Sequence, residues 1–322
     1  MIPRLLGPVQ HGLLVPRGGR PVGPWVPPPD TLTLQQRIDA ASASSTLDLG
    51  GNVYSVGATV DKALTIVGGT IDVAAGQKGL TITASDVTVS GMTITGPQFS
   101  NYVDAEAGIY TNATSGAPLS GLTITGCTIT GFGGYGIRTR FTNSVNITGN
   151  TITDIVYAGV MALSMDNGLV DGNTIRRIGE VNDPDLGYNA YGIVFSQNAS
   201  EARSEDCTAS DNLVEYVPNW HAFDTHGGIR IAFTGNTVNY CRKAFFITTG
   251  DATTPEDITI TDNVMNNPYS PVVADVTAIW YTQATNITIT GNSGHGWGSG
   301  RDIDDWGPGS TGETISGNTF TN

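Results

Sequence analysis

The sequence feature that most constrains the fold is a short motif that recurs from near residue 64 to the end of the chain. Its clearest copy is Val145-Asn-Ile-Thr-Gly-Asn-Thr-Ile152, in which Asn150 marks the register. The same register position, called the marker, is occupied by Gly69, Met92, Cys127, Asn150, Asn173, Asn212, Asn236, Asn263, Asn292 and Asn318, at intervals of 23 to 39 residues. A base period of about two dozen residues with longer insertions predicts a solenoid, in which each repeat stacks on its neighbours.

Apolar residues alternate with small polar ones around every marker. Three positions before it stand Ile66, Val89, Ile124, Ile147, Val170, Ala209, Phe233, Ile260, Ile289 and Ile315, and two positions after it stand Ile71, Ile94, Ile129, Ile152, Ile175, Val214, Val238, Met265 and Phe320, with Gly294 as the exception. This alternation predicts strands with one face buried, because successive side chains of a strand point to opposite sides. The segments are too short, and too rich in Thr, Val, Ile and Gly, to predict helices.

Stacking these repeats at the strand spacing of about 4.8 Å would place the marker asparagines above one another. An amide carries two donors and an acceptor, so stacked Asn side chains can bond along the column and to turn backbone. This period and Asn column resemble the right-handed parallel β-helix of the pectate-lyase-like superfamily, over about residues 30–322. The resemblance implies an all-β, right-handed parallel β-helix of about ten coils, and it leaves the reaction open because a fold does not fix function.

The N-terminal segment differs in composition from the repeats. Residues 1–30 are rich in Pro and Gly and lack the apolar core and cleavage site of a signal peptide. They predict an extended arm that cannot fold alone. The chain therefore divides into an arm, residues 1–30, and a β-helix with an N-terminal helical cap, residues 31–322.

A short amphipathic helix is expected to cap the first coil, since a solenoid otherwise exposes its core there. Asp30 or Thr31 can cap a helix that runs through about Ala43, with Leu34, Ile38 and Ala41 on one face.

The two ends of the chain also resemble those of proteins that work within a larger assembly. An N-terminal arm, a β-helix and a last repeat without a capping element are similar to homotrimeric phage tailspikes and fibres. That resemblance implies a homotrimer, an arm that docks on a larger assembly such as a phage tail, and a location in a virion tail or outside the cell. The alternative explanation of the uncapped last repeat is that the natural chain continues past Asn322.

Charge and motif content exclude several function classes. The 29 acidic and 15 basic residues give a net charge of −14, which disfavours nucleic acid and anionic membranes as partners. An acidic polysaccharide could bind only through a local basic patch. Three cysteines do not form a disulfide framework. The sequence holds no HExxH, Walker A or nucleophile-elbow motif, and Asp302, Asp304 and Asp305 lack calcium-loop spacing, so we expect no metal and no cofactor.

One outward face stands out by its side chains. Counting back from the markers gives a second strand in each coil, whose first outward column reads Tyr110, Arg138, Met161, Val194, Asp224, Phe246 and Trp280, and whose second reads Asn112, Arg140, Leu163, Ser196, His226, Thr248 and Thr282. Insertions beside this face would form groove walls. Aromatic and polar residues along a groove suit a sugar polymer. The predicted binding residues are Arg138, Arg140, Tyr110, Tyr135, Tyr191, Trp220, Trp280, Asp183 and Asp185.

The densest group of candidate catalytic residues is Trp220-His-Ala-Phe-Asp-Thr-His-Gly-Gly228, which contains Asp224, His226 and His221. The segment is similar to a His-x-x-Asp-Thr-His-Gly stretch of bacterial and phage β-helix proteins. A His with an Asp partner can act as a general base on a sugar, and Arg138 and Arg140 could neutralise a uronate, as a lyase requires. Alternatively, Asp224 could form the acid/base pair of a glycoside hydrolase with Glu180, Asp183 or Asp185.

These residues predict a carbohydrate-active β-helix that binds and cleaves a cell-surface polysaccharide, as a lyase or as a glycoside hydrolase, and that resembles a phage tailspike. The alternative is a structural or receptor-binding tail protein, or an adhesin, without catalysis. The aromatic residues would then cover a subunit interface or bind a glycan without cleaving it.

Overall fold

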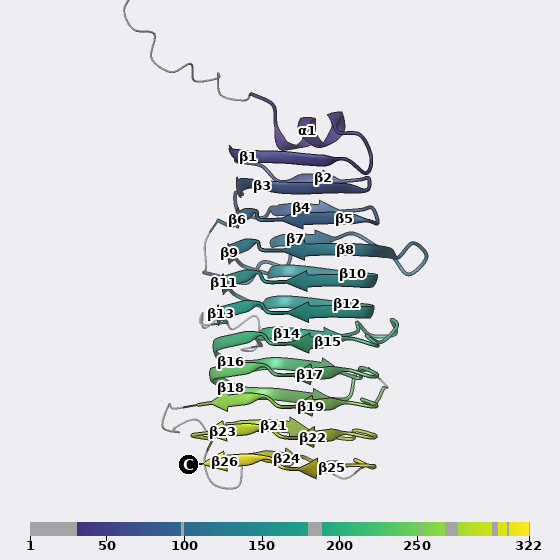
Figure 1. The fold of residues 1–322 in the computed structure, drawn as a ribbon, viewed down its shortest axis with the longest axis vertical. Coiled ribbons are helices and arrows are strands. Elements are labelled where there is room, and N and C mark those ends of the chain that lie inside the picture. The colour runs from purple at the N-terminus through teal and green to yellow at the C-terminus, as the bar shows by residue number, and fades with distance from the viewer. Residues whose placement is uncertain are drawn as a thin grey trace, which may run out of the picture. The chain divides into compact units, whose positions relative to one another are not determined.

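The computed structural model describes residues 31–97, 100–179, 189–251, 253–267, 276–297, 302–307 and 309–321. These residues form one helix, α1, and 26 strands, β1 to β26, whose mutual pairings are all parallel. Figure 1 shows the strands stacked as successive coils. The predicted parallel β-helix is therefore confirmed. The proposed arm lies outside the described residues, so the boundary between residues 30 and 31 stays a prediction.

Each coil contributes to three parallel sheets. The first sheet contains β2 (Ala58–Val60), β4 (Lys78–Ile82), β7 (Ala107–Thr111), the N-terminal halves of β10 (Tyr135–Thr148) and β12 (Ala158–Asp171), β14 (Tyr191–Ser196), the C-terminal halves of β16 (Leu213–His226) and β18 (Thr237–Thr248), β21 (Thr277–Tyr281) and β24 (Ile303–Asp305). This is the sheet that carries the candidate site.

The strand before each marker residue belongs to the second sheet, and the strand after it belongs to the third. The second contains the start of β1 (Thr46–Tyr54) and β3 (Leu64–Asp72), β5 (Val87–Ser90), β8 (Leu119–Thr125), the C-terminal halves of β10 and β12, β15 (Thr208–Ser210), β17 (Ala232–Thr234), β19 (Thr259–Thr261), β22 (Thr288–Thr290) and β25 (Thr314–Ser316). The third contains the ends of β1 and β3, β6 (Thr93–Thr95), β9 (Thr128–Phe132), β11 (Thr151–Ile155), β13 (Thr174–Ile178), the N-terminal halves of β16 and β18, β20 (Val264–Asn266), β23 (Ser293–His295) and β26 (Thr319–Thr321).

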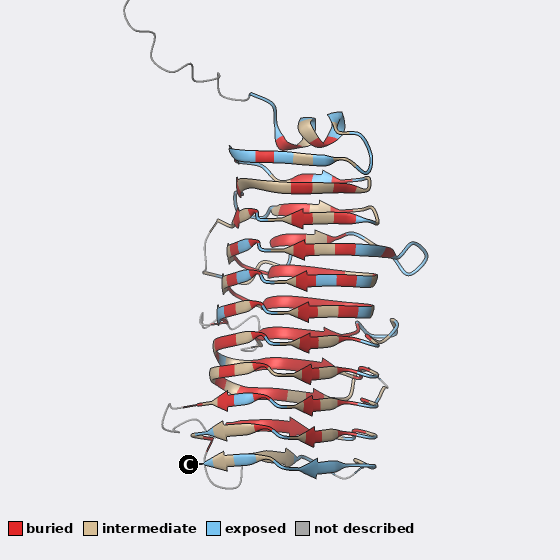
Figure 2. Ribbon diagram, viewed as in Figure 1, coloured by how far each residue is buried: buried red, intermediate tan, exposed pale blue. Residues whose placement is uncertain are grey.

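The core is built from the predicted apolar columns. The residues three before the marker are fully buried from Ile66 through Ile289, and those two after it are fully buried from Ile71 through Met265. Ile315 is 44% exposed because it lies on the last described coil, which has no further coil stacked on it. Figure 2 shows the buried residues following the stack of coils, with more exposure at its two ends.

The marker asparagines form a continuous hydrogen-bonded column, here called the Asn ladder, from Asn150 to Asn318. The Nδ2 of Asn150 donates to the Ile124 carbonyl and to Oδ1 of Asn173, both at 2.9 Å. The same Oδ1 accepts the Asn150 backbone N–H at 2.9 Å. Each later pair repeats this pattern. The predicted bonds along the column and to turn backbone are both present.

Helix α1 (Leu34–Ala40) covers the start of the core with Leu34 and Ile38, which are buried as predicted. The predicted boundaries were wrong: the N-cap is Thr33, and the helix ends before Ala43. Thr33 caps because its hydroxyl accepts from the Gln36 N–H while the Gln36 side chain accepts from the Thr33 N–H. This reciprocal capping box fixes the first turn more strongly than a single cap would.

Within the described residues, no helix has the length and hydropathy needed to cross a membrane.

The Asn ladder predicts a position-dependent loss of stability. Asn173→Ala would leave the Asn150 N–H without its partner and would remove the side-chain bonds to the Ile147 carbonyl, to Nδ2 of Asn150 and to Oδ1 of Asn212. The last two groups each keep one other bond. We expect the free energy of unfolding to fall by about 3 kcal/mol, because buried unpaired polar groups cost about 1–3 kcal/mol each. Urea unfolding followed by circular dichroism measures the change.

The matched control is Asn146→Ala, an exposed Asn on β10. It should change the unfolding free energy by less than about 0.5 kcal/mol. Equal effects of the two substitutions would contradict a structural role for the ladder.

Candidate functional site

The outward side of the first sheet brings the predicted columns into register. Arg138 pairs with Met161, Met161 with Val194, and Val194 with Asp224. Arg138 and Asp224 are therefore three coils apart, as predicted, which is about 14 Å along the axis at the strand spacing.

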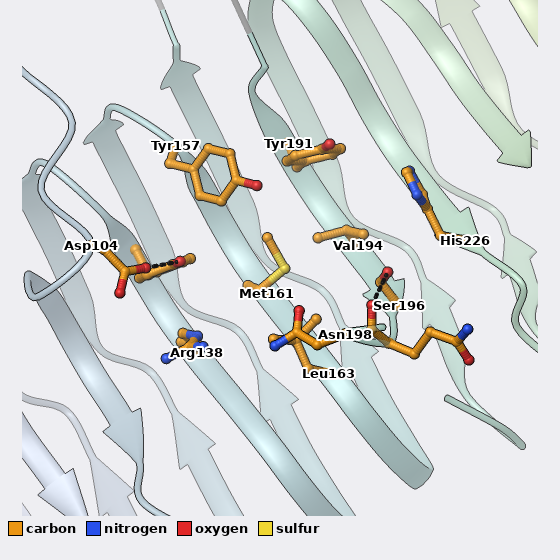
Figure 3. A pocket seen from close by; sticks show the side chains of 12 residues that line it. Asp104, Arg138, Tyr157, Met161, Leu163, Tyr191, Val194, Ser196, Asn198 and His226 are labelled. Atoms are coloured by element: carbon orange, nitrogen blue, oxygen red, sulfur yellow. Dashed lines mark hydrogen bonds between the residues drawn. The ribbon is translucent and has the colours of Figure 1, made fainter. Parts of the chain in front are cut away.

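A cavity of about 340 Å³ opens over these coils. It is lined by Asp104, Tyr135, Arg138, Tyr157, Met161, Leu163, Tyr191, Val194, Ser196, Gln197, Asn198 and His226. Figure 3 shows Arg138 and Asp104 at one end, His226 at the other, and Met161 between them. The site is thus an elongated pocket with polar ends and an apolar floor, which suits a chain of sugar rings.

Tyrosines form one wall of the pocket. The Tyr135 and Tyr157 rings meet edge to face at 5.6 Å, and Tyr157 meets Tyr191 in the same way at 5.5 Å. Tyr191 in turn lies edge to face with the rings of His221, at 6.0 Å, and His226, at 6.4 Å. Burial raises the pKa of Tyr157 to about 12. These phenols therefore stay protonated at neutral pH and present hydroxyl groups and ring edges to a ligand.

Asp104 closes the Arg138 end of the pocket. Its Oδ1 accepts hydrogen bonds from Tyr135, at 2.6 Å, and from Tyr102, at 3.0 Å. The Tyr135 bond is the main reason that the pKa of Asp104 lies below its ordinary value. The loop that carries it is anchored by buried Glu106, whose carboxylate accepts the N–H groups of Gly76 and Gly133, both at 2.8 Å.

Arg138 is held in a fixed position. Its Nη1 donates to the Tyr110 hydroxyl at 2.8 Å, and its guanidinium lies about 5 Å from the ring centres of both Tyr110 and Tyr135. Only 9% of the residue is exposed. A guanidinium pre-ordered by aromatic rings is well suited to hold an anionic group of a ligand.

The opposite end of the pocket contains the predicted triad of Asp224, His221 and His226. Asp224 is fully buried, and its Oδ2 lies 2.5 Å from Nδ1 of His221. Its Oδ1 lies 3.0 Å from Nε2 of His226. The His226 side chain is 33% exposed and lines the pocket, which leaves its Nδ1 as the ring nitrogen for a ligand.

The pKa values of the two histidines are shifted in opposite directions. Burial lowers the pKa of His221 to about 4, and the bond to Asp224 offsets this only in part. Its buried Nε2 has no hydrogen-bond partner, so neutral His221 carries its proton on Nδ1 and donates it to Asp224. Burial also acts to lower the pKa of His226, but the charge of Asp224 raises it above its ordinary value.

Asp224 itself stays ionised. Burial acts to raise its pKa, but the positive charge of His226 and the hydrogen bond from His221 bring the pKa below its ordinary value. A buried carboxylate next to a partly exposed imidazole tunes the imidazole toward proton transfer near neutral pH.

His221 lies within β16 and is fully buried. Its ring is stacked between Trp220, at 4.6 Å, and Phe246, at 3.8 Å. The pairing of β16 with β18 shifts register between Val217 and His221, where β16 passes from the third sheet to the first. Because of this irregularity, counting alternate residues from a marker does not give the side of the sheet on which His221 lies.

The remaining predicted residues lie around the pocket. Arg140 is paired with Glu201 and is not among the residues that line the cavity. Trp220 covers His221, and Trp280 stacks on Phe246 at 4.2 Å, farther along the groove. Asp183 and Asp185 lie outside the described residues, as does the alternative partner Glu180.

Sequence reasoning missed Asp104, although it lies in the insertion of residues 98–106 that precedes β7. It also missed Gln197 and Asn198, which follow β14 and line the cavity. These three residues lie in the sequence next to the ends of first-sheet strands, and that position is the feature that could have indicated them. Among the described residues, no group of three or more His, Cys, Asp and Glu is arranged to hold a metal ion.

Solved structures with the same fold include several that act on carbohydrates. A DFA-IIIase from Arthrobacter chlorophenolicus A6 without its lid, in complex with GF2, matches with a TM-score of 0.63 and 12% identity, over 89% of this chain and 82% of that one. An alginate lyase from Paenibacillus sp. str. FPU-7 matches with a TM-score of 0.59 and 15% identity, over 87% and 99%. The Dettilon tailspike protein gp208 matches with a TM-score of 0.55 and 13% identity, over 86% and 61%. At these identities the likeness establishes the fold alone.

No curated protein sequence matches the chain. The sequence profile of the family described as "Right handed beta helix region" matches residues 56–293, which is most of the chain. The matched span includes the Asn ladder from Asn150 to Asn292 and the whole pocket. The chain therefore belongs to the family of right-handed β-helix proteins.

Proposed function

We propose that this protein binds an anionic polysaccharide along the first sheet and cleaves it, with His226 as the group that moves the proton. The observation that carries the proposal is the contact of partly exposed His226 with buried, ionised Asp224 at one end of an elongated pocket. A DFA-IIIase and an alginate lyase share the fold, which supports a carbohydrate as the substrate.

The charge states favour elimination over hydrolysis. A glycoside hydrolase needs a carboxylic acid that stays protonated to donate to the leaving oxygen. Asp224 and Asp104 both have lowered pKa values, so both are ionised at neutral pH. The proton carrier is then His226, which suits a lyase: Nδ1 takes the C5 proton of a uronate, the C–H electron pair forms the C4–C5 double bond, and the C4–O bond breaks with its electron pair on the oxygen. The departing oxygen then takes a proton from water, and the protonated His226 returns its proton to solvent.

Arg138 has a different role from the one expected for a lyase arginine. Neutralising the carboxylate of the sugar that loses its proton requires direct contact with that sugar. Arg138 lies three coils, about 14 Å, from the strand of His226. We therefore assign it to anchoring an anionic group of another sugar in the same chain.

The assembly predicted from the sequence remains a proposal. A tailspike has the same fold, although this chain spans about 61% of that protein. This likeness supports a location in a phage tail or outside the cell, and the homotrimer is proposed from the sequence resemblance alone. The docking of the proposed arm on a larger assembly is likewise a proposal.

The first test is incubation with bacterial capsular polysaccharides and polyuronates, with reducing ends and the ultraviolet absorbance of unsaturated uronates measured together. We expect both signals. Reducing ends without the absorbance would reject elimination and indicate a hydrolase. Absence of both signals would favour the alternative of a binding protein without catalysis.

His226→Asn should lower kcat by about 100-fold or more, because general base catalysis contributes about 10²–10⁴. The matched control is His295→Asn, since His295 is exposed on β23 of the third sheet and should leave kcat unchanged. Circular dichroism would verify that both variants fold. A His226→Asn enzyme with normal kcat would remove His226 from the mechanism.

The pH profile provides a separate prediction. A base must be deprotonated, so kcat should rise with pH through the raised pKa of His226, above the ordinary value of about 6.5. Asp224→Asn removes the charge that raises this pKa, and it should move the inflection to lower pH while also lowering kcat. An inflection that does not move would contradict the assigned coupling.

Arg138→Gln should raise KM for the anionic polymer about tenfold with little change in kcat, because the lost contact is the same before and during reaction. Arg177→Gln is the control, as Arg177 lies on β13 of the third sheet and pairs with Asp154. A selective fall in kcat for Arg138→Gln would instead place Arg138 at the reacting sugar.

A further inference from the structure

Three aromatic rings continue the groove beyond the pocket. Asp224 pairs in register with Phe246, and Phe246 with Trp280. The backbone N–H of Trp306 donates to the backbone carbonyl of Tyr281 at 2.9 Å, which places Trp306 one coil farther along the same sheet. The rings of His226 and Phe246 lie 6.3 Å apart, so this aromatic series begins where the pocket ends.

The rings form a stack with an open end. Phe246 and Trp280 are parallel, with centres 4.2 Å apart and an angle of 2°. Trp280 and Trp306 lie 5.6 Å apart at an angle of 33°. Trp280 is 9% exposed, whereas Trp306 is 65% exposed. Among the described residues, Trp306 is the one aromatic side chain that ranks with the exposed large hydrophobics. The exposed Trp306 ring, supported from behind by two stacked rings, presents a rigid aromatic face to a ligand.

The charges beside the stack differ from those at the other end of the pocket. Trp280 pairs in register with Asp304, and Asp305 directly precedes Trp306. Carboxylates accept hydrogen bonds from sugar hydroxyls but repel a uronate. The anion-binding Arg138 lies on the far side of His226, as the register places it three coils before Asp224.

We propose that Phe246, Trp280 and Trp306 form an aromatic shelf that binds neutral sugar residues of the polysaccharide. Phe246 lies between the His221 and Trp280 rings, so the pyranose face would stack on the exposed face of Trp306, which the other two rings support. The neighbouring carboxylates would accept hydrogen bonds from the sugar hydroxyls. This inference rests on the proposed function, because it specifies further the polysaccharide that the pocket is proposed to bind. It implies a polymer of mixed charge, with an anionic sugar at Arg138 and neutral sugars at the shelf.

The experiment is calorimetric titration of the full chain with cellohexaose, maltohexaose, mannohexaose, xylohexaose and, as the anionic probe, hexagalacturonate. At least one neutral oligosaccharide should bind. Trp306→Ala should weaken that binding about tenfold, since an aromatic contact contributes up to about 1.5 kcal/mol and tenfold corresponds to about 1.4 kcal/mol. Trp306→Phe, which retains a ring, should restore most of it.

Two controls isolate the shelf. Val264→Ala removes an exposed apolar side chain, 41% accessible, from β20 of the third sheet, and it should bind the neutral probes as the unchanged protein does. His226→Asn should abolish cleavage but retain neutral-probe binding. Hexagalacturonate binding should respond to Arg138→Gln and not to Trp306→Ala.

The proposal is overturned if none of the neutral probes binds, or if Trp306→Ala binds them as tightly as the unchanged protein. Neutral binding that depends on Trp306, in a protein that cleaves no polymer, would uphold the shelf and reject only the proposed catalysis. If the protein cleaves a polyuronate but its binding of neutral oligosaccharides does not depend on Trp306, the proposed catalysis is upheld and the shelf is rejected.

Discussion

The structure depends on the hydrogen bonds that each marker asparagine makes to the next coil. A parallel solenoid needs every coil to keep the same register, because a shift of one residue would turn each inward side chain outward. The side chain of Asn173 binds the Asn150 N–H, the Ile147 carbonyl and the Asn212 side chain at once. These bonds fix the turn of one coil against those of its two neighbours. The apolar columns then stack with little freedom to slip.

This register also aligns the pocket, because the single strand β16 connects the Asn ladder to the pocket. The strand begins at Leu213, directly after Asn212 of the ladder, and runs through the third sheet into the first. Asp224 and His226 lie near its end. The position of the carboxylate against Val194 and Phe246 is therefore set by the same stacking that orders the core. A buried ionised Asp is tolerable there because two imidazoles face its two oxygens.

Periodicity explains what the sequence could predict and what it could not. Inward columns, the Asn ladder and the outward positions of Arg138, Asp224 and His226 all follow from counting residues to a marker. Asp104 could not be placed because it lies in an insertion, where no marker defines the register. Arg140 was placed on the correct face, but its partner Glu201 lies in a segment without strand alternation. The burial of His221 could not be predicted, because the pairing of β16 with β18 shifts register between Val217 and His221.

The distance from strand to marker is the same in four of the coils, and this has a consequence for how such a chain can change. Ile137, Val160, Phe223 and Ile279 each precede their marker by the same number of residues, whereas the segments before the strands differ in length. Loop length is thereby uncoupled from coil register. A loop such as the one that carries Asp104 can be lengthened or replaced without moving Asp224 or His226. The solenoid can therefore keep Asp224 and His226 in place while the loops beside the pocket change in length and sequence to fit a different polymer.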